Sequence, residues 1–426
     1  MNARRIRPLT RRIDAEIDAV PSKSFTHRAL VAAALASGPS AVVDPLVADD
    51  TRITLDGLRG LGVAIVESAD RWTVGGLPGA VPGGGVLDLG DSGTSLRFLL
   101  SVAALGRAPS RLDGSPRLRE RPLEELAVAL RSLGGEVELT AGRLPARTGG
   151  LPPAGGTVAI PSGRSSQFAS SLLLIGSRLP GGLDLHLEAP VVSSPYVDLT
   201  VSVLRAFGVA VSRIGDDHWR VEEGSYPGTE YRVEGDHSAA SYFLAAAAVS
   251  GGRLRVRGLS PDSQQADACL QRILTGAGCE VLRGPDWIEV RGHGEIRPMD
   301  HDMAAAPDLV PTLAVLALFA AGPSTFRRIG HLRHKESDRL ELLARNLEAL
   351  GRPARAIEDR LEIGPPVQAL RGGTVVTASD HRMAMAFAIA GLRVPGVVVD
   401  DADCVGKSNP GFWDQLDGLR RLRTGS

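Results

Sequence analysis

The chain has 426 residues, of which 43% are hydrophobic, so it is long and apolar enough to form two domains with separate cores. Its 48 basic and 49 acidic side chains leave a net charge of −1, which argues against a general affinity for nucleic acid or anionic membranes. The three cysteines, Cys269, Cys279 and Cys404, have no CxxC spacing and are too few for a disulfide scaffold, which fits a reducing compartment.

The first twenty residues predict a strand rather than an export signal. Arginines among residues 4–12 are followed by acidic residues among residues 14–18, where a signal peptide would need an apolar stretch. The longest apolar run, residues 309–321, contains a proline and falls short of the ~20 residues that a membrane-spanning helix needs. We therefore expect a cytoplasmic protein. The arginines at the start are Arg4, Arg5, Arg7, Arg11 and Arg12.

A short polar cluster opens an apolar, helix-like run six times along the chain, at intervals of roughly 70 residues. Ser and Asp are good N-cap residues, and the start of a helix carries a partial positive charge that attracts anions. Several such helix starts, if they converge, would form an anion-binding site. The clusters are residues 22–24, 91–95, 165–167, 236–238, 307–308 and 379–382.

A second, more amphipathic helix follows each capped helix, and strand-like segments flank both. The repeating unit is a strand, a helix, a strand, a helix and then paired strands. With three units in each of two domains, the break falls near residues 234–236, and the strand-like stretch over residues 12–20 could close either domain. The second helices are expected at residues 52–61, 123–133, 196–207, 264–275, 338–350 and 412–422.

Positively charged side chains recur at these helix starts, the end of a helix where a cation is least favourable. In the densest case, residues 334–339, Lys335 and Arg339 are four residues apart and share a helix face, with Glu336 between them. A solvated surface helix would contain the same residue types. Their repetition in separate units favours an anionic ligand instead. The other cations in such places are Lys23, Arg121, Arg382 and, in a loop, Lys407.

Three local patterns suggest other chemistry, and each is weak. Gly406-Lys407-Ser408 resembles the end of a P-loop, but Asp401 stands where the first glycine is required. His331 and His334 have the spacing of a metal pair without a third ligand. Cys404 could be a nucleophile, although a buried structural cysteine explains it better. We therefore expect no metal, no cofactor and no nucleotide P-loop.

Taken together, the motifs resemble those of the 5-enolpyruvylshikimate-3-phosphate synthase family, in the family's order and spacing over nearly the whole chain. The resemblance implies an α/β fold, a two-domain inside-out α/β barrel with three βαβαββ repeats per domain and the active site in the interdomain cleft. It implies one domain of residues 21–234 and another of residues 1–20 with 235–426. The motifs are PSKSFTHRAL, GDSGTSLRFL, RERP, SSQF, residues 195–198, PDL, HKESDRL, DHRMAM and the Lys407 loop.

The resemblance also implies a reaction and its partners. The enolpyruvyl group of phosphoenolpyruvate would move to the 5-hydroxyl of shikimate 3-phosphate through a tetrahedral intermediate, with release of phosphate, as the sixth step of the shikimate pathway. The protein would be a monomeric transferase of aromatic amino acid and chorismate biosynthesis, inhibited by glyphosate, with no nucleic-acid or membrane partner.

The family pattern assigns roles to individual residues. Asp308 would be the base on the acceptor hydroxyl, and Glu336 with Lys23 would handle the proton at the methylene carbon. Phosphoenolpyruvate would be held by Lys23, Gly93, Arg121, Arg339, Arg382 and Lys407. Shikimate 3-phosphate would be held by Ser24, Arg28, Ser165, Ser166, Gln167, Ser193, Tyr196, Asp308, His331 and Lys335.

Some positions depart from the common family pattern and leave the acceptor open. His331 and Asp91 each stand where asparagine is frequent, Phe98 where proline is common in part of the family, and residues 408–409 where Thr-Phe is common. His331 could change how the acceptor is held. Asp91 adds a negative charge near the expected donor site, unless helix amides offset it or it points outward.

Three alternatives accompany this interpretation. A sister transferase acts on UDP-N-acetylglucosamine, but it typically has a cysteine near residues 117–120 and a Lys-Asn pair where this chain has Lys23-Ser24. A transferase adapted to another shikimate-like acceptor would keep the same donor site. A catalytically silent paralogue that binds anionic metabolites would have lost proton-transfer groups, whereas Lys23, Asp308 and Glu336 are all present.

Overall fold

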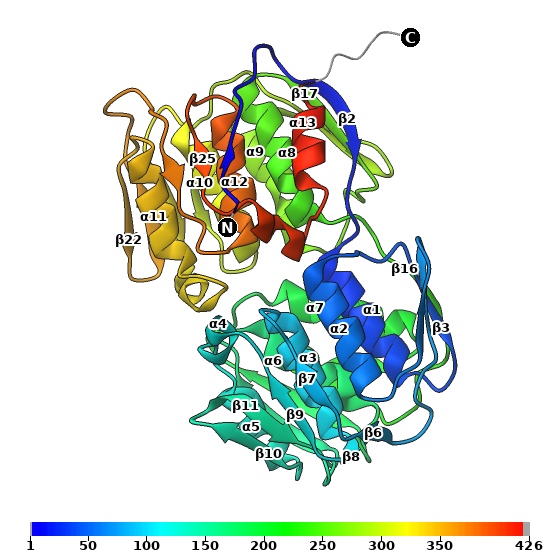
Figure 1. Ribbon diagram of the computed structural model, residues 1–426. Coiled ribbons are helices and arrows are strands. Elements are labelled where there is room, and N and C mark those ends of the chain that lie inside the picture. Colours follow the sequence, from blue (N-terminus) through cyan, green and yellow to red (C-terminus); the bar gives the residue numbers. More distant parts are fainter. Residues whose placement is uncertain (1, 421–426) are drawn as a thin grey trace. The chain divides into compact units, whose positions relative to one another are not determined.

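The computed structural model describes residues 2–420 and divides into two compact units, each with its own hydrophobic core (Figure 1). The N-terminal unit is Pro21–Val233, and the C-terminal unit joins Met1–Val20 to Glu234–Ser426. The first twenty residues belong to the C-terminal unit because strand β2 (Asp14–Asp18) pairs in parallel with β17 (Arg253–Arg257). The sequence pattern alone had left this placement open.

Three four-stranded sheets of the N-terminal unit share one strand order. In each sheet a parallel pair is extended on one side by an antiparallel hairpin. The first sheet is β16 (Glu230–Arg232), β3 (Ser40–Val43), β5 (Arg71–Val74) and β4 (Ile65–Glu67); the second is β7 (Val86–Asp88), β9 (Ser110–Asp113), β11 (Arg143–Thr148) and β10 (Val137–Thr140); the third is β12 (Gly156–Pro161), β13 (Leu183–Glu188), β15 (His218–Val221) and β14 (Val211–Arg213); β6 (Val81–Gly83) pairs separately with β8 (Gly106–Ala108).

The interior of the N-terminal unit is formed by three helices that are buried almost all round. In α1 every residue from Phe25 to Leu35 is buried, as expected for a run rich in alanine, leucine and valine. The strands alternate between buried and exposed residues, so one face of each sheet covers the helices and the other meets solvent. The buried helices are α1 (Lys23–Leu35), α3 (Gly93–Ala104) and α6 (Ser166–Gly176); α2 (Asp49–Gly60), α5 (Glu124–Ser132), α7 (Pro195–Ala206) and the short α4 (Pro116–Arg119) flank them.

The C-terminal unit repeats this plan. Two sheets have the same four-strand order, and in a third sheet β1 lies antiparallel to β25. Residues 2–20 therefore supply strands to two sheets of this unit. The sheets are β2, β17, β19 (Trp287–Arg291) and β18 (Glu280–Arg283); β20 (Asp300–Asp302), β21 (Ser324–Arg327), β23 (Arg360–Ile363) and β22 (Ala354–Ile357); and β24 (Thr374–Val375), β25 (Val398–Val399) and β1 (Arg4–Arg5).

The helices of the C-terminal unit follow the same division into buried and flanking elements. This repeated arrangement of strands and helices confirms the predicted α/β fold with helices inside and sheets outside. The buried helices are α8 (His237–Ser250), α10 (Val310–Leu318) and α12 (His381–Gly391); the others are α9 (Leu270–Gly276), α11 (Arg339–Ala349), α13 (Phe412–Gly418) and the 3₁₀ turns η1 (Ala266–Cys269), η2 (Pro307–Leu309), η3 (Gly330–His334) and η4 (Asp403–Lys407).

Four of the six predicted helix starts are capped by a polar side chain from the predicted cluster: Ser92, Ser165, Asp236 and Asp380 accept backbone N–H groups of α3, α6, α8 and α12. Ser22 makes no such side-chain bond at α1, and α10 begins after the 3₁₀ turn η2 without one.

The helix predicted at residues 264–275 begins later than expected. The side-chain amide of Gln265 donates to the carbonyl of Gly235 at 2.7 Å, and the backbone N–H of Gln265 donates to Ser263 Oγ at 3.1 Å. These bonds hold the residue outside a helix. The predicted end of the last helix, residues 421–422, lies outside the described residues. Within residues 2–420, no helix combines the length and apolar character that a membrane span requires.

Candidate active site

Arg339, the first residue of α11, lies among three carboxylates in the C-terminal unit. Its Nη1 donates to Asp308 Oδ1 at 3.1 Å, its Nη2 to Glu336 Oε2 at 2.7 Å and its Nε to Asp380 Oδ2 at 2.7 Å. The residue is 1% exposed, so these charge-assisted bonds operate away from bulk water. The surrounding carboxylates raise the pKa of Arg339 although burial opposes this, and the guanidinium stays charged.

Asp380 joins the start of α12 to Arg339. Its Oδ1 accepts the backbone N–H of Arg382 at 3.0 Å as the helix cap, and its Oδ2 also accepts the Ser337 hydroxyl at 3.0 Å. The side chain of Arg382 turns to Asp308, with Nη2 at 2.7 Å from Oδ2. Two arginines therefore bracket Asp308, one from the start of α11 and one from the first turn of α12.

Asp308 is an ionised carboxylate in this setting. Burial alone would raise its pKa, but Arg382, Lys335 and Arg339 together hold the pKa of this carboxyl well below its usual range. Its side chain is 18% exposed and belongs to η2, ahead of the buried helix α10. The N-cap positions of η2 and α10 are Ala306 and Leu309, so Asp308 is a charge partner of the arginines and not the helix cap that its sequence position suggests.

The remaining predicted residues of this unit border the same cluster. Lys407, at the end of η4, has Nζ 3.9 Å from Glu336 Oε1 and is 7% exposed. Lys335 follows η3, and its charge acts on both Asp308 and His331. Burial, with Lys335 next in effect, lowers the pKa of His331 to about 3, so its imidazole is neutral, and within residues 2–420 its Nε2 has no hydrogen-bond partner.

In the N-terminal unit, Lys23 starts α1 and its Nζ donates to Asp50 Oδ2 of α2 at 3.0 Å. The two side chains are 14% and 3% exposed, so the pair is largely shielded from solvent. The main-chain oxygen of Asp50 accepts the Ser95 hydroxyl at 3.2 Å, which ties α2 to the first turn of α3. Asp50 has no distinctive signal in the sequence, since an acidic residue in the first turn of a helix is ordinary.

Arg28, one turn into α1, is 2% exposed and directed at internal partners. It donates to the main-chain oxygens of Ser24 and Tyr196 at 3.0 and 3.1 Å and to the Thr200 hydroxyl at 2.7 Å. Its guanidinium lies 5.2 Å from the ring centroid of Phe98, so this departure from the family pattern supplies a cation–π contact. Burial lowers the pKa of Arg28 to about 10, and it remains protonated at neutral pH.

Gly93, the first residue of α3, lies against two arginines. A Cβ atom at this position would come 2.2 Å from Arg121 Nη1 and 2.7 Å from Arg97 Nη1. Arg97 donates to the main-chain oxygens of Gly93 and Pro122 at 3.0 and 2.9 Å, which fixes the approach of the Arg121 segment. The carboxylate of the neighbouring Asp91 accepts the hydroxyl of Ser115, the residue that caps α4.

The predicted polar residues of α6 and α7 lie at the starts of those helices. Ser165 caps α6 and Ser166 is its first residue, while Gln167 donates through Nε2 to Thr94 Oγ1 of α3 at 3.0 Å. Within residues 2–420, the buried Gln167 Oε1 has no hydrogen-bond partner. Ser193 is buried with φ of 55°, a left-handed conformation uncommon for serine, just before α7 and its second residue Tyr196.

Two further buried groups border the cluster around Arg339. The hydroxyl of Tyr242 accepts from Arg382 Nη1 at 3.3 Å, and burial raises its pKa to about 12. Burial and the charge of Asp308 raise the pKa of Asp267 to about 7. Neither residue gave a signal in the sequence, because Tyr242 lies inside an alanine-rich helix and Asp267 in a mixed polar segment.

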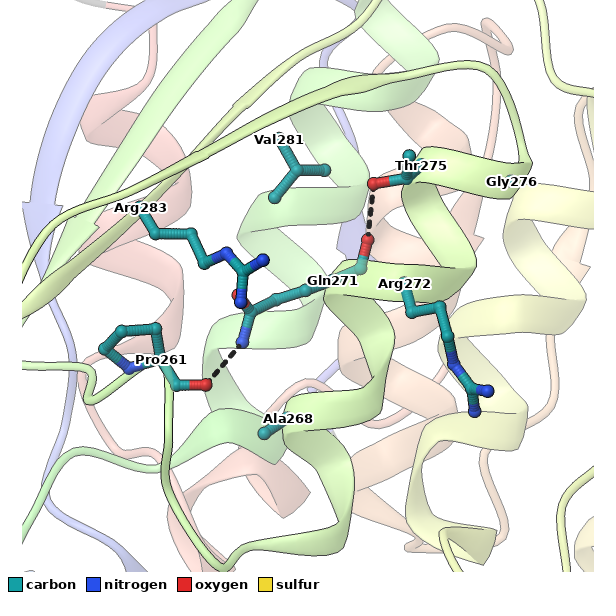
Figure 2. A pocket seen from close by; sticks show the side chains of 8 residues that line it. All are labelled: Pro261, Ala268, Gln271, Arg272, Thr275, Gly276, Val281 and Arg283. Atoms are coloured by element: carbon teal, nitrogen blue, oxygen red, sulfur yellow. Dashed lines mark hydrogen bonds between the residues drawn. The ribbon is translucent and has the colours of Figure 1, made fainter.

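Other features of the C-terminal unit lie outside this chemistry. Burial raises the pKa of the Cys404 thiol, whose Sγ bonds the carbonyl of Asp401 at 3.1 Å, as a structural cysteine would. A hollow of about 550 Å³ borders α9 and contains none of the predicted site residues. Figure 2 shows the Gln271 side chain directed at the carbonyl of Pro261, to which it donates at 3.2 Å; Arg283 also lines this hollow.

Comparison with known proteins gives consistent results. The family model of EPSP synthase (3-phosphoshikimate 1-carboxyvinyltransferase) matches residues 9–416. A 3-phosphoshikimate 1-carboxyvinyltransferase of Methanoculleus marisnigri is 44% identical over 411 residues, covering 95% of this chain and 97% of the relative. An EPSP synthase structure from Acinetobacter baumannii has a TM-score of 0.80 and 26% identity, covering 98% of both chains.

The fold extends to a second kind of enzyme. The enolpyruvyl transferase NikO from Streptomyces tendae has a TM-score of 0.78 at 20% identity, covering 97% of this chain and 96% of that one. At that identity the likeness concerns the fold alone.

Proposed function

The chain belongs to the EPSP synthase family, and we infer from this membership that it transfers the enolpyruvyl group of phosphoenolpyruvate to the 5-hydroxyl of shikimate 3-phosphate, with release of phosphate. The observation that carries this inference is the match of one family's model to residues 9–416. The buried cations and carboxylates around Arg339 supply the charge that two anionic substrates and two proton transfers need.

For the donor, we propose that phosphoenolpyruvate is held by Lys23, Gly93, Arg121, Arg339, Arg382 and Lys407. Guanidinium forks bind carboxylate and phosphate oxygens in pairs, and lysines add point charges. The absence of a side chain at Gly93 supports the proposal, because a Cβ there would displace the Arg121 guanidinium.

For the acceptor, the proposed ligands supply hydroxyl, amide and charged groups suited to a phosphate and a polyol. Arg28 also positions two other proposed ligands, since its guanidinium donates to the main-chain oxygens of Ser24 and Tyr196. Gln167 offers a buried acceptor oxygen to a sugar-like hydroxyl. The proposed set is Ser24, Arg28, Ser165, Ser166, Gln167, Ser193, Tyr196, Asp308, His331 and Lys335.

The proton steps follow from the carboxylates. In the addition step, the acceptor oxygen bonds to C2 of phosphoenolpyruvate, Asp308 takes the hydroxyl proton, and Glu336 with Lys23 delivers a proton to the methylene carbon. In the elimination step, that carbon returns its proton to Glu336 with Lys23 and a carbon–carbon double bond forms. The C–O bond to the phosphate breaks, and the phosphate leaves with the electron pair and takes up the proton held by Asp308.

Substrate binding would activate Asp308 as a base. With both arginines in place its pKa is too low for an effective base. An anionic substrate that draws Arg382 away from Asp308 Oδ2 removes a large favourable charge contact, and the proton affinity of the carboxylate rises.

The test is phosphate release with both substrates, with each alone, and with shikimate or UDP-N-acetylglucosamine as the acceptor. We expect release only with phosphoenolpyruvate and shikimate 3-phosphate together. Asp308→Asn should lower kcat by roughly 10²–10⁴-fold, whereas the matched control Asp302→Asn, on an exposed carboxylate paired with Arg328, should leave it unchanged. Turnover only with another acceptor would identify a transferase adapted to that acceptor, and binding without turnover would identify a catalytically silent paralogue.

We also propose that the protein acts as a monomer in the cytoplasm.

A further inference from the structure

A basic hollow of about 460 Å³ lies where the two ends of the described chain meet in the C-terminal unit. We call it the arginine pocket and define it as residues 4–7 with Leu416, Asp417 and Arg420. Strand β1 brings the first residues here by pairing with β25, and the last turn of α13 with the residues just after it brings the others. None of the residues assigned to the proposed reaction lines this hollow.

The charges in the arginine pocket are not balanced. Four arginines line it against one carboxylate, Asp417, whereas the chain as a whole has a net charge of −1. Asp417 bonds Arg4 Nη2 at 2.6 Å through Oδ2 and also accepts from Arg420 through Oδ1. Within residues 2–420, the side chains of Arg5 and Arg7 form no ion pair, and Arg420 Nε is buried without a hydrogen-bond partner.

The fold fixes where these guanidinium groups can reach. Ile6 is 2% exposed and its N–H bonds the carbonyl of Val397 at 2.9 Å, so this residue anchors the segment in the core. Arg5 and Arg7 flank Ile6 on an extended chain, and their side chains therefore leave on the opposite, exposed side. Arg4 is held over the Trp413 ring, 4.7 Å from its centroid, beside Asp417. Two exposed arginines thus stand next to two that share one carboxylate.

We propose that the arginine pocket binds a small anion with two or more linked phosphoryl groups. A net of three positive charges, four arginines less Asp417, matches the roughly three negative charges of a diphosphate group near pH 7. The planar guanidinium group binds two phosphate oxygens at once. Within the described part of the chain, the pocket offers two guanidinium groups without an ion pair, those of Arg5 and Arg7, and two that Asp417 already orients. Inorganic diphosphate and a nucleoside triphosphate share this chemistry. The proposal does not depend on the reaction proposed above.

The test is equilibrium binding of inorganic diphosphate, ATP and orthophosphate to the full chain by calorimetry, at about 0.15 M salt where non-specific attraction is screened. We expect diphosphate and ATP to bind more tightly than orthophosphate. The double variant Arg5→Ser/Arg7→Ser should weaken both by about tenfold or more, because each lost charged bond contributes a sizeable part of the affinity. An equal loss of affinity for diphosphate and ATP would show that the pocket recognises the phosphoryl groups. A larger loss for ATP would show that it contacts the nucleoside as well.

Two further variants keep the test decisive. Arg283→Ser removes an exposed arginine from another hollow of the same unit (Figure 2) and should leave binding unchanged. Asp417→Asn removes the carboxylate that competes for Arg4 and Arg420, and binding should become several-fold tighter. This gain cannot come from a variant that fails to fold.

Three outcomes would overturn the proposal. The first is unchanged affinity in Arg5→Ser/Arg7→Ser together with no gain in Asp417→Asn. The second is an equal loss in Arg283→Ser, which would mean a general attraction to positive charge. The third is binding of a short single-stranded RNA that depends on Arg5 and Arg7 while diphosphate and ATP do not bind, which would make this surface a nucleic-acid contact.

Discussion

Replacing Arg339 by methionine removes one buried guanidinium from three carboxylates. Asp308 keeps Arg382 at 2.7 Å and Glu336 keeps Lys407 at 3.9 Å. Asp380 is 0% exposed and, within residues 2–420, keeps the Ser337 hydroxyl, the N–H of Arg382 and, at 3.9 Å, Nδ1 of His381, but no arginine or lysine side chain. The cost of the substitution should therefore fall mainly on Asp380.

Breaking a buried ion pair by removing one partner costs about 3–5 kcal/mol, because an uncompensated charge stays in the interior. We expect Arg339→Met to lower the free energy of unfolding of the C-terminal unit by that amount. The matched control is Arg333→Met, which removes the nearby pair of Arg333 with Asp338 at 3.0 Å, where the side chains are 31% and 41% exposed. Such exposed pairs contribute about 0–1 kcal/mol.

The assay is hydrogen exchange on peptides from α11 and α12, with α3 and α6 of the N-terminal unit as an internal reference. The double variant Arg339→Met/Asp380→Asn should recover roughly 2 kcal/mol relative to the sum of the single changes, because it leaves no orphaned charge. Part of the stability gap between parent and variant should also close as pH falls below about 4, since Arg339 contributes to the lowered pKa of Asp308 and that contribution stabilises the parent only while the carboxyl is ionised. A cost no larger than that of Arg333→Met, or full additivity in the double variant, would refute the reasoning.

Three other changes test the site. Gly93→Ala forces the Arg121 guanidinium to move, so the KM for phosphoenolpyruvate should rise roughly tenfold and inhibition by glyphosate should weaken, both read in the phosphate-release assay; unchanged inhibition would remove the steric argument. Asp267 has a raised pKa of about 7, so the free energy of unfolding of the parent should fall as pH rises from about 4 to 7, whereas that of Asp267→Asn should not. The same pH dependence in urea unfolding of both proteins would contradict this. His331 is neutral in the structure, so His331→Asn should change the KM for shikimate 3-phosphate and leave the pH–rate profile above about pH 5 unaltered, and a displaced profile would contradict this.

The repeated fold could be predicted because its signals are local. Polar caps such as Ser92 and Asp380 and the apolar runs after them depend on neighbours within one helical turn. The pairing of β2 with β17 could not be predicted, because it joins residues more than 200 positions apart and either domain offered a partner. The family resemblance supplied what the local pattern left open.

The cations at helix starts could be predicted, but the carboxylates that pair with them could not. The sequence placed Lys23, Arg339 and Arg382 at helix starts, where a positive charge is unfavourable without a nearby anion. No sequence feature marked Asp50 as the partner of Lys23, and the pattern predicted for Asp380 only the role of a helix cap. The identity of a buried charge partner depends on which helices pack together, and that information lies in tertiary contacts rather than in spacing.

These partners change what a cation at a helix start implies. Lys23 pairs with Asp50 at 3.0 Å and Arg382 pairs with Asp308 at 2.7 Å, so each of these cations already has an internal carboxylate as its partner. A substrate anion must therefore exchange with a carboxylate rather than fill an empty position, and the net gain from each contact is smaller than the charge alone suggests. The exchange has a chemical consequence, because a carboxylate that loses its arginine becomes a stronger base. In the proposed mechanism, phosphoenolpyruvate binding and activation of Asp308 are the same event, so Arg382→Lys should weaken donor binding and lower kcat together.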